Sequence, residues 1–176
     1  LNMVDEVIAV SADDKRRMVA AGVNAQKITI VPHGVDMRRF TGGNGAIVRE
    51  EYGISKKTPV LIFHGTLHYW PNTEAVRFIR TRLIEPLLAL HPNLKILICG
   101  MNPPLEYSHP AIIFTGSVLN LEDYISAADV CICPLFAGGG TRLKLLEYMA
   151  VQKPIVSTSK GAEGIPRTGQ MIIADT

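Results

Sequence analysis

The chain has 176 residues, of which 47% are hydrophobic, and a formal net charge of +2. This length suits one domain, or one domain and a fragment of another, and the apolar content allows a sizeable core and disfavours disorder. The charge is too small to indicate nucleic acid or an anionic membrane surface as a partner.

Three cysteines are present, and an odd number does not indicate a complete disulfide framework. Cys131 and Cys133 lie two residues apart in an apolar run, so they share one face of an expected strand. We interpret them, together with Cys99, as core residues in a reducing compartment rather than as metal ligands. This indicates a cytoplasmic location; peripheral attachment to a membrane is the alternative for a full-length parent.

In the first part of the chain, strands are expected at residues 6–10 and 28–31, where apolar residues cluster. The segment between them has the pattern of a helix. Ser11 is placed to cap this helix and Gly22 to end it.

Residues 41–45, Thr-Gly-Gly-Asn-Gly, form the most linker-like stretch of the sequence. We therefore divide the chain into an entry segment, 1–42, and a domain, 43–176. Neither a signal peptide nor a long apolar span is visible. The chain begins at Leu1 and opens within an element, so we expect it to be excised from a longer protein.

In the second part, three helices alternate with strands. Asn72 is expected to cap the first helix, and Pro86 to kink or split it. Asn120 caps the second, and the third ends near Gln152. The strands are continuous apolar runs at residues 59–64, 95–99, 111–115, 130–133, 154–158 and 171–174.

Continuous apolar strands that alternate with helices are typical of a parallel sheet covered on both faces. The sequence therefore predicts an α/β, doubly wound, Rossmann-like fold. Such folds bind ligands beyond the carboxyl ends of their strands. The turns expected to form a site are those after His64, Cys99, Thr115, Cys133 and Thr158.

A glycine-rich turn lies between the strand at 130–133 and the third helix. Its glycines can adopt positive φ, so backbone N–H groups can converge on one point. Thr141 is a good N-cap, and the helix behind it adds its positive end. The turn thus predicts a phosphate site, with a plain tight turn as the alternative; it consists of Gly138, Gly139, Gly140 and Thr141.

Glu147 lies at the edge of the apolar stripe expected on the third helix, which is formed by Leu143, Leu146 and Ala150. A half-desolvated carboxylate needs a partner. One interpretation is an ion pair with Lys144, three residues earlier, and the other is a carboxylate that binds ligand hydroxyls. Lys144 and Arg142 are either solvated or add positive charge to the phosphate site.

The turn after His64 offers the flexible Gly65 and the hydroxyl of Thr66 to a ligand. His64 and His68 straddle a strand end and a loop, which does not favour a metal site. The aromatic side chains that follow, Tyr69 and Trp70, are expected to cover the core rather than to stack on a ligand. No G-x-G-x-x-G motif follows a strand, which disfavours a nicotinamide dehydrogenase.

Taken together, the stretches at residues 7–40, 63–75, 114–128 and 128–165 resemble the carboxyl-terminal domain of family 4, or group 1, retaining glycosyltransferases of the GT-B fold. The most specific stretches read FTGSVLNLEDYISAADVCICPL and GGGTRLKLLEYMAVQKPIVSTSKGAEGI. By this resemblance, residues 1–42 enter from an amino-terminal domain and 43–176 form the nucleotide-sugar-binding domain.

The resemblance implies transfer of a glycosyl group from a UDP, GDP or ADP sugar to an acceptor, with retention and without a metal or other cofactor. The acceptor-side residues lie in an amino-terminal domain of the same parent chain, so no catalytic residue is assigned here. The isolated domain is expected to be inactive. Glu147 matches the family's ribose-binding glutamate, and Gly65 and Thr66 match the turn that approaches the diphosphate. The backbone that faces the diphosphate and sugar is matched by Gly138, Gly139, Gly140 and Thr141.

Two features depart from the family pattern. The first glutamate of the paired motif would fall near Gly138 or Gly139, where no carboxylate stands. The Arg and Lys that usually follow the first strand of the domain are replaced by Thr66 and the stretch 69–72. A subset of the family has a GGGT-R-L-K version, so we expect Arg142 or Lys144 to supply the positive charge.

Two other functions stay open. A non-catalytic nucleotide-sugar-binding module would explain the missing glutamate and basic pair. A GT-B nucleotide-sugar epimerase needs titratable groups for proton abstraction, and the candidates His33, His64 and His68 are poorly placed for it.

Overall fold

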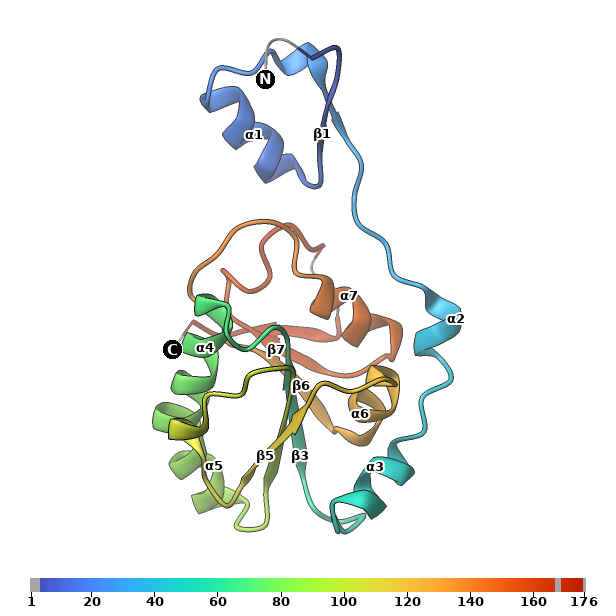
Figure 1. The fold of residues 1–176 in the computed structure, drawn as a ribbon, viewed down its shortest axis with the longest axis vertical. Helices are drawn as coiled ribbons and strands as arrows, with labels where there is room; N and C mark the ends of the chain where they lie inside the picture. The colour runs from blue at the N-terminus through green and yellow to red at the C-terminus, as the bar shows by residue number, and fades with distance from the viewer. Residues whose placement is uncertain (1–3, 167–168, 176) are drawn as a thin grey trace.

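The computed structural model describes residues 4–166 and 169–175, which form a small amino-terminal unit and a larger α/β domain (Figure 1). The larger domain is built on a parallel sheet with the strand order β5-β4-β3-β6-β7-β8. The central strands are almost wholly buried, as in sheets covered on both faces. The strands are β3 (Val60–His64), β4 (Lys95–Cys99), β5 (Ile112–Gly116), β6 (Val130–Cys133), β7 (Ile155–Ser157) and β8 (Met171–Ile173).

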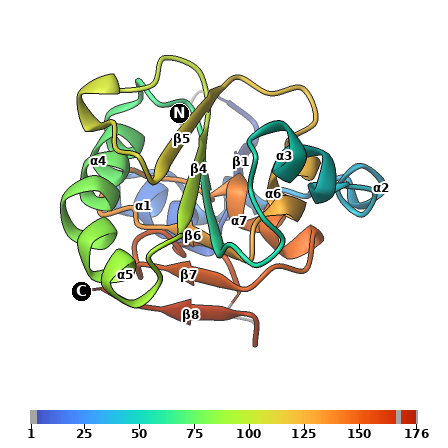
Figure 2. The ribbon, with the colours of Figure 1, turned by 90° about the horizontal axis from the view of Figure 1, so that it is seen from below.

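Helices cover both faces of this sheet, as the view along it shows (Figure 2). One face carries α4 (Trp70–Phe78) and α5 (Ile84–Leu90). The other carries α3 (Gly45–Glu51), α6 (Leu121–Ala127) and α7 (Leu143–Ala150). The doubly wound, Rossmann-like fold that the sequence predicts is therefore confirmed.

The order of the strands changes direction at β3. The chain first adds β4 and β5 on one side of β3 and then places β6 on its other side. After β3 the chain passes into α4 on one face, and after β6 into α7 on the opposite face. The diverging connections leave a crevice at the carboxyl ends of β3 and β6, which is where ligands bind in this class of fold.

The helix after β3 is interrupted, as expected from Pro86. A π-helical turn, Ile79–Leu83, separates α4 from α5. Proline has no N–H to bond the carbonyl four residues earlier, and its ring displaces that carbonyl, so the regular ladder is lost in the preceding turn. A 3-10 turn, Leu105–Tyr107, lies between β4 and β5.

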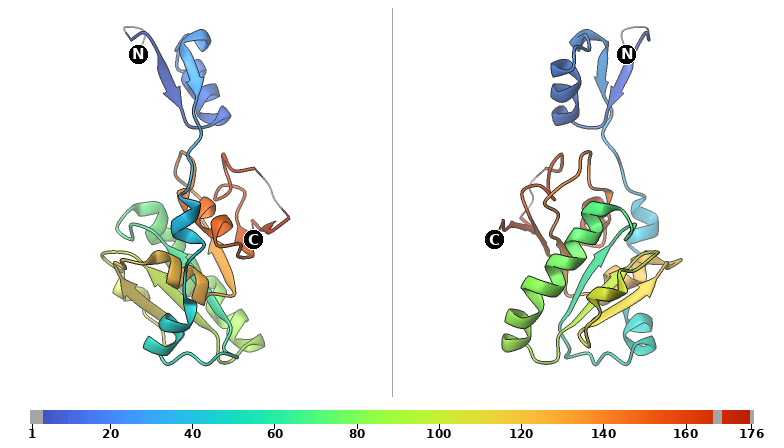
Figure 3. Two further views of the ribbon diagram at one scale, coloured as in Figure 1. Left: turned by 90° about the vertical axis from the view of Figure 1, so that its right-hand side faces the viewer. Right: turned by 60° about the vertical axis from the view of Figure 1, so that its left-hand side comes forward.

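The amino-terminal unit has a core of its own, made by Ala9, Val23 and Ile28. Ser11 caps its helix as predicted, accepting a hydrogen bond from the Asp14 amide, and Gly22 follows the helix end with φ of +90°. Figure 3 shows the unit joined to the larger domain by an extended link. Its elements are β1 (Val7–Ala9), α1 (Ala12–Ala20), a 3-10 turn (Ala25–Lys27) and β2 (Ile28–Ile30), and β1 and β2 are parallel.

Two short helices follow the link and were not predicted, α2 (Met37–Phe40) and α3. Gly43 and Gly45, read as linker residues, pack directly on α6. A Cβ at Gly43 would lie 2.3 Å from the carbonyl oxygen of Glu122, and one at Gly45 would lie 2.4 Å from the Ala127 amide nitrogen. The glycines here allow close helix packing. The division into 1–42 and 43–176 stays a prediction.

The three cysteines are free and buried in the core, which confirms their interpretation as core residues. Burial raises the pKa of all three thiols, that of Cys99 to about 12. Within residues 4–166 and 169–175, no helix combines the length and apolarity needed to cross a membrane.

Candidate functional site

A cavity of about 390 Å³ opens at the crevice between β3 and β6. The turn after β3 and the start of α4 form one wall, and the turn after β6 and α7 form the other. It lies where the strand order reverses, so its position matches the site predicted from the sequence. It is lined by His64, Gly65, Thr66, Tyr69, Pro71, Asn72, Leu135, Ala137, Thr141, Arg142, Leu143, Lys144 and Glu147.

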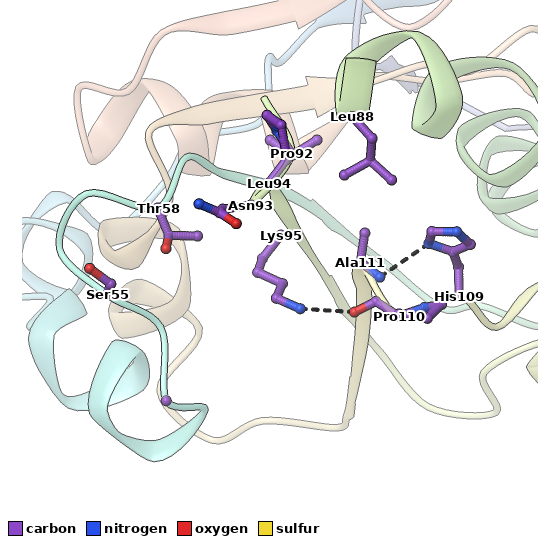
Figure 4. A pocket seen from close by; sticks show the side chains of 11 residues that line it. Ser55, Thr58, Leu88, Pro92, Asn93, Leu94, Lys95, His109, Pro110 and Ala111 are labelled. Atoms are coloured by element: carbon purple, nitrogen blue, oxygen red, sulfur yellow. Dashed lines mark hydrogen bonds between the residues drawn. The ribbon is translucent and has the colours of Figure 1, made fainter. Parts of the chain in front are cut away.

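A second cavity, of about 440 Å³, lies at the amino-terminal ends of the strands (Figure 4). Its side chains come from segments that precede β3, β4 and β5, among them Thr58, Asn93 and Pro110. The Lys95 ammonium in this cavity donates to the carbonyl oxygen of Pro110, 2.9 Å away. Ligands of doubly wound folds bind at the carboxyl ends of the strands, so this cavity is not the candidate site.

The glycine-rich turn after β6 is rich in free hydrogen-bond donors. Gly138 and Gly140 have φ of +98° and +77°, conformations that glycine adopts without strain. Among the described residues, no acceptor is bonded to the backbone N–H groups of residues 138–144. The last of these groups form the first turn of α7, where the helix dipole is positive. The segment is therefore suited to an anion.

Arg142 braces this turn rather than pointing freely into the cavity. Its guanidinium donates to the carbonyl oxygens of Gly139 and Gly140, the latter at 2.9 Å, and approaches that of Ala137 at 3.4 Å. One planar cation thus holds three carbonyls of the turn. The sequence predicts that Arg142 is either solvated or adds positive charge to the phosphate site. In the structure its guanidinium binds the backbone of the turn instead.

Thr141 was expected to cap α7, and this was wrong. Arg142 occupies the N-cap position, without a side-chain cap bond, and the helix begins at Leu143. The Thr141 hydroxyl is buried and, within the described residues, has no hydrogen-bond partner. A buried hydroxyl without a partner is costly, so a ligand that bonds to it would recover that cost.

The buried face of α7 differs from the predicted stripe. Leu143 is 48% exposed, and Leu146 is only partly buried. The face that packs on the sheet is formed instead by Lys144, Leu145, Tyr148 and Ala150. The periodicity pointed elsewhere because it treats every lysine as solvated, whereas Lys144 occupies a core-facing position here.

Lys144 is the unusual charge of the site, with only 9% of its surface exposed. Its ammonium donates to the side-chain oxygen of Asn72 at 2.9 Å and lies 4.0 Å from the centre of the Phe63 ring. Burial lowers the pKa of Lys144 to about 8. The bonded partner is a neutral amide, so the buried cation is only partly compensated and favours an anion in the cavity.

Asn72 holds the lysine and also shapes the turn after β3. It lies in the first turn of α4 and does not cap the helix as expected, because Tyr69 occupies the N-cap position. Its side-chain nitrogen donates to the carbonyl oxygen of Thr66 at 2.9 Å. A Cβ at Gly65 would lie 2.9 Å from that nitrogen and 3.1 Å from the Lys144 ammonium. Gly65 therefore leaves room for the pair, while Thr66 is exposed at the cavity.

Glu147 faces His64, the last residue of β3. The carboxylate oxygen lies 3.2 Å from His64 Nε2, without the alignment of a hydrogen bond. Burial lowers the pKa of His64 despite this neighbour, so the ring is neutral near pH 7. The ion pair with Lys144 considered from the sequence is replaced by two contacts, Glu147 with His64 and Lys144 with Asn72.

His64 and Asn72 are the residues that sequence reasoning missed as parts of the site. From the sequence, His64 is considered as a strand end, as a disfavoured metal ligand and as a poorly placed epimerase candidate, and Asn72 only as a helix cap. A polar residue at the carboxyl end of a buried central strand was the available signal for His64. His68, by contrast, lies 3.1 Å from the Asn102 side chain and does not line the cavity.

The expectation that Tyr69 and Trp70 cover the core was wrong. They are 53% and 63% exposed, and Tyr69 lines the cavity. The side chain buried beneath this turn is Leu67, which leaves the two aromatic rings at the surface. Across the described residues, no three His, Cys, Asp or Glu side chains gather as a metal site would require. The absence of a metal or cofactor requirement stays a prediction.

The site therefore joins two chemically different ends. The glycine-rich turn, the start of α7 and the Lys144 ammonium favour a group with several negative charges. The Glu147 carboxylate, one helical turn further along, can accept hydrogen bonds from hydroxyls. A ligand with phosphates and neighbouring hydroxyls fits this arrangement.

Comparison with known proteins identifies the family. The family model described as glycosyl transferases group 1 matches residues 58–176. A D-inositol 3-phosphate glycosyltransferase of Geodermatophilus obscurus is 28% identical over 174 residues, which is 89% of this chain and 38% of that protein. A glycosyltransferase of Methanocaldococcus jannaschii is 27% identical over 92% of this chain and 43% of its own length.

Solved structures give the same fold. HepE of Anabaena in complex with UDP and glucose superposes with a TM-score of 0.79 at 17% identity, over 99% of this chain and 51% of HepE. WaaG, a glycosyltransferase involved in lipopolysaccharide biosynthesis, has a TM-score of 0.72 at 14% identity, over 88% of this chain and 44% of WaaG. The chain spans about two fifths of the curated relatives and half of HepE. It belongs to the group 1 glycosyltransferases and has the Rossmann-like fold of one half of a GT-B enzyme.

Proposed function

We propose that this chain is the donor-binding part of a retaining glycosyltransferase that takes a hexosyl group from a nucleotide-diphosphate sugar. The observation that carries the proposal is the buried Lys144 ammonium, whose bonded partner is the neutral Asn72 amide. A diphosphate would supply the missing negative charge. HepE, which has the same fold, was crystallised with UDP and with UDP-glucose, which supports a UDP-type donor ahead of GDP or ADP.

In this proposal the diphosphate lies against the free N–H groups of residues 138–144 and the Lys144 ammonium. The nucleotide ribose lies over Glu147, and the turn at Gly65 and Thr66 borders the diphosphate. Arg142 keeps the glycine-rich turn in shape. Lys144 thus replaces the basic pair expected after β3, and Arg142 does not.

The chemical contribution of the site is electrostatic. As the bond between the anomeric carbon and the diphosphate breaks, negative charge grows on the leaving oxygen. Preorganised N–H groups and a buried ammonium stabilise that charge without reorganising, and no metal is needed. The acceptor is bound by an amino-terminal domain of the parent protein and attacks from the face that the diphosphate leaves. We place this protein in the cytoplasm, free or peripheral to a membrane.

One observation favours a second function, a non-catalytic nucleotide-sugar-binding module. Among the described residues that line the cavity, Glu147 is the single carboxylate. Activity of the full-length parent on a sugar acceptor separates the two functions, since a module binds the donor without turnover.

The binding test is a titration of the chain with UDP, GDP, ADP and their hexose conjugates, followed by amide chemical shifts. We expect shifts centred on residues 138–147 for one nucleotide. Lys144→Met should weaken binding about ten- to hundredfold, since a charge-assisted phosphate contact is lost. Lys57→Met, at an exposed lysine before β3, is the matched control and should bind normally. No response to any of the nucleotides would contradict the proposal.

A further inference from the structure

The contact between His64 and Glu147 joins two rigid elements of the site. His64 ends β3, where it pairs in register with Cys99 of β4. Its ring packs edge-on against Tyr148 of α7, with centroids 5.1 Å apart and planes at 87°. The imidazole is therefore fixed both by the sheet and by the helix that carries Glu147.

The neutral His64 ring can donate a hydrogen bond to the carboxylate. A neutral imidazole has one N–H, and the tautomer with the proton on Nε2 directs it toward Glu147. Nε2 is buried, and within the described residues it has no aligned partner. The Glu147 side chain is 23% exposed and has three rotatable bonds, so it can align with the ring while the ring stays fixed.

Without this contact, the Glu147 carboxylate could pair with Lys144 instead. The charged neighbours of His64 are Glu147 and Lys144, three residues apart on α7. Opposite charges at this spacing on a helix attract each other. A glutamate released from His64 would be free to turn toward Lys144 and to neutralise the cation that the diphosphate needs.

We propose that His64 is a positioning residue that holds the Glu147 carboxylate for the ribose hydroxyls and away from Lys144. This inference rests on the proposed function, because it takes Glu147 as the ribose contact. It assigns a role in ligand binding to a buried histidine.

The test compares two ligands, a nucleoside diphosphate and its 2′,3′-dideoxy analogue, using whichever of UDP, GDP and ADP binds the native chain most tightly. The measured quantity is the ratio of their dissociation constants. If Glu147 bonds to the ribose, the native ratio should be about tenfold or more. His64→Leu should bring the ratio close to one, whereas His64→Gln, which keeps an N–H donor near the Nε2 position, should retain most of it.

The controls separate a positioning role from a loss of structure. Lys144→Met should weaken both ligands equally and leave the ratio unchanged. A native ratio near one would contradict the ribose assignment of Glu147 and therefore the proposed function. A large native ratio that survives in both His64 variants would overturn the role of His64 alone. Equal loss of both ligands in His64→Gln and His64→Leu would also overturn it, since a purely structural role predicts that result.

Discussion

Raising the pH should increase the contribution of Lys144 to the stability of the unliganded protein and should weaken binding of the donor. Burial lowers the pKa of this lysine from 10.5 to about 8. Between these values the unfolded chain holds a proton on Lys144 that the folded chain has released. The contribution of Lys144 to folding stability therefore rises with pH from about 8 to about 10.5. Over the same range the site loses the cation that attracts the diphosphate, so donor affinity falls.

The size of the effect follows from the shift. A change from 10.5 to about 8 corresponds to roughly 3 kcal/mol, at 1.36 kcal/mol for each pKa unit. The buried thiols act in the opposite direction, because burial raises their pKa and the folded chain keeps protons that the unfolded chain releases. Their contribution lowers stability above about pH 9 and must be subtracted.

Comparison with Lys144→Met separates the contribution of Lys144 from that of the thiols, since this variant lacks the ammonium and keeps the three cysteines. The free energy of unfolding is measured in urea at several pH values between 7 and 10.5 for both proteins. The native protein should gain roughly 3 kcal/mol relative to Lys144→Met across this range. Donor affinity of the native protein should decline through pH 8 and that of the variant should not. Parallel stability profiles would show that Lys144 is not a buried cation and would refute the reasoning.

Three other substitutions test the site. Arg142→Lys should weaken donor binding about tenfold although the charge is kept, because one ammonium cannot bond to all the carbonyl oxygens that the guanidinium holds. The control is Arg82→Lys at an exposed site, which should bind the donor normally in the same titration. Thr141→Val should leave the midpoint of thermal unfolding unchanged or slightly raised, because it removes a buried hydroxyl without a partner, and donor affinity should fall. A lower midpoint would contradict this. Gly100→Ala should destabilise the fold by roughly 3 kcal/mol in denaturant unfolding, because its Cβ would lie 1.9 Å from the Gly65 carbonyl oxygen. A loss of less than about 1 kcal/mol would contradict the close approach of the two turns.

The sheet could be predicted from the sequence because buried parallel strands are continuous apolar runs. The predicted run at 95–99 and the strand β4 (Lys95–Cys99) coincide, as do the run at 130–133 and β6. The short helices α2 and α3 could not be predicted, since four to seven residues beside glycines carry too little periodicity. The composition around Gly43 and Gly45 predicts a linker, whereas in the structure their lack of a Cβ allows close packing on α6.

The composition of the site was less predictable than its place. The glycine-rich turn could be predicted as a candidate site because its glycines can adopt positive φ and turn backbone N–H groups toward one point. The roles of Arg142 and Lys144 could not be divided from the sequence, because both are long cations near one helix start. Only tertiary packing decides that the guanidinium folds back onto the turn and that the ammonium passes under Gly65 to reach Asn72.

The segment from His64 to Asn72 provides partners for two charged side chains of α7. Lys144 and Glu147 lie one turn apart on this helix, and alone they would attract each other. The end of β3 and the start of α4 instead offer each of them a neutral partner, an imidazole for the carboxylate and an amide for the ammonium. Because neither partner carries an opposite full charge, both charges stay available at the cavity. His64 and Asn72 thus hold the two charged side chains of α7 apart.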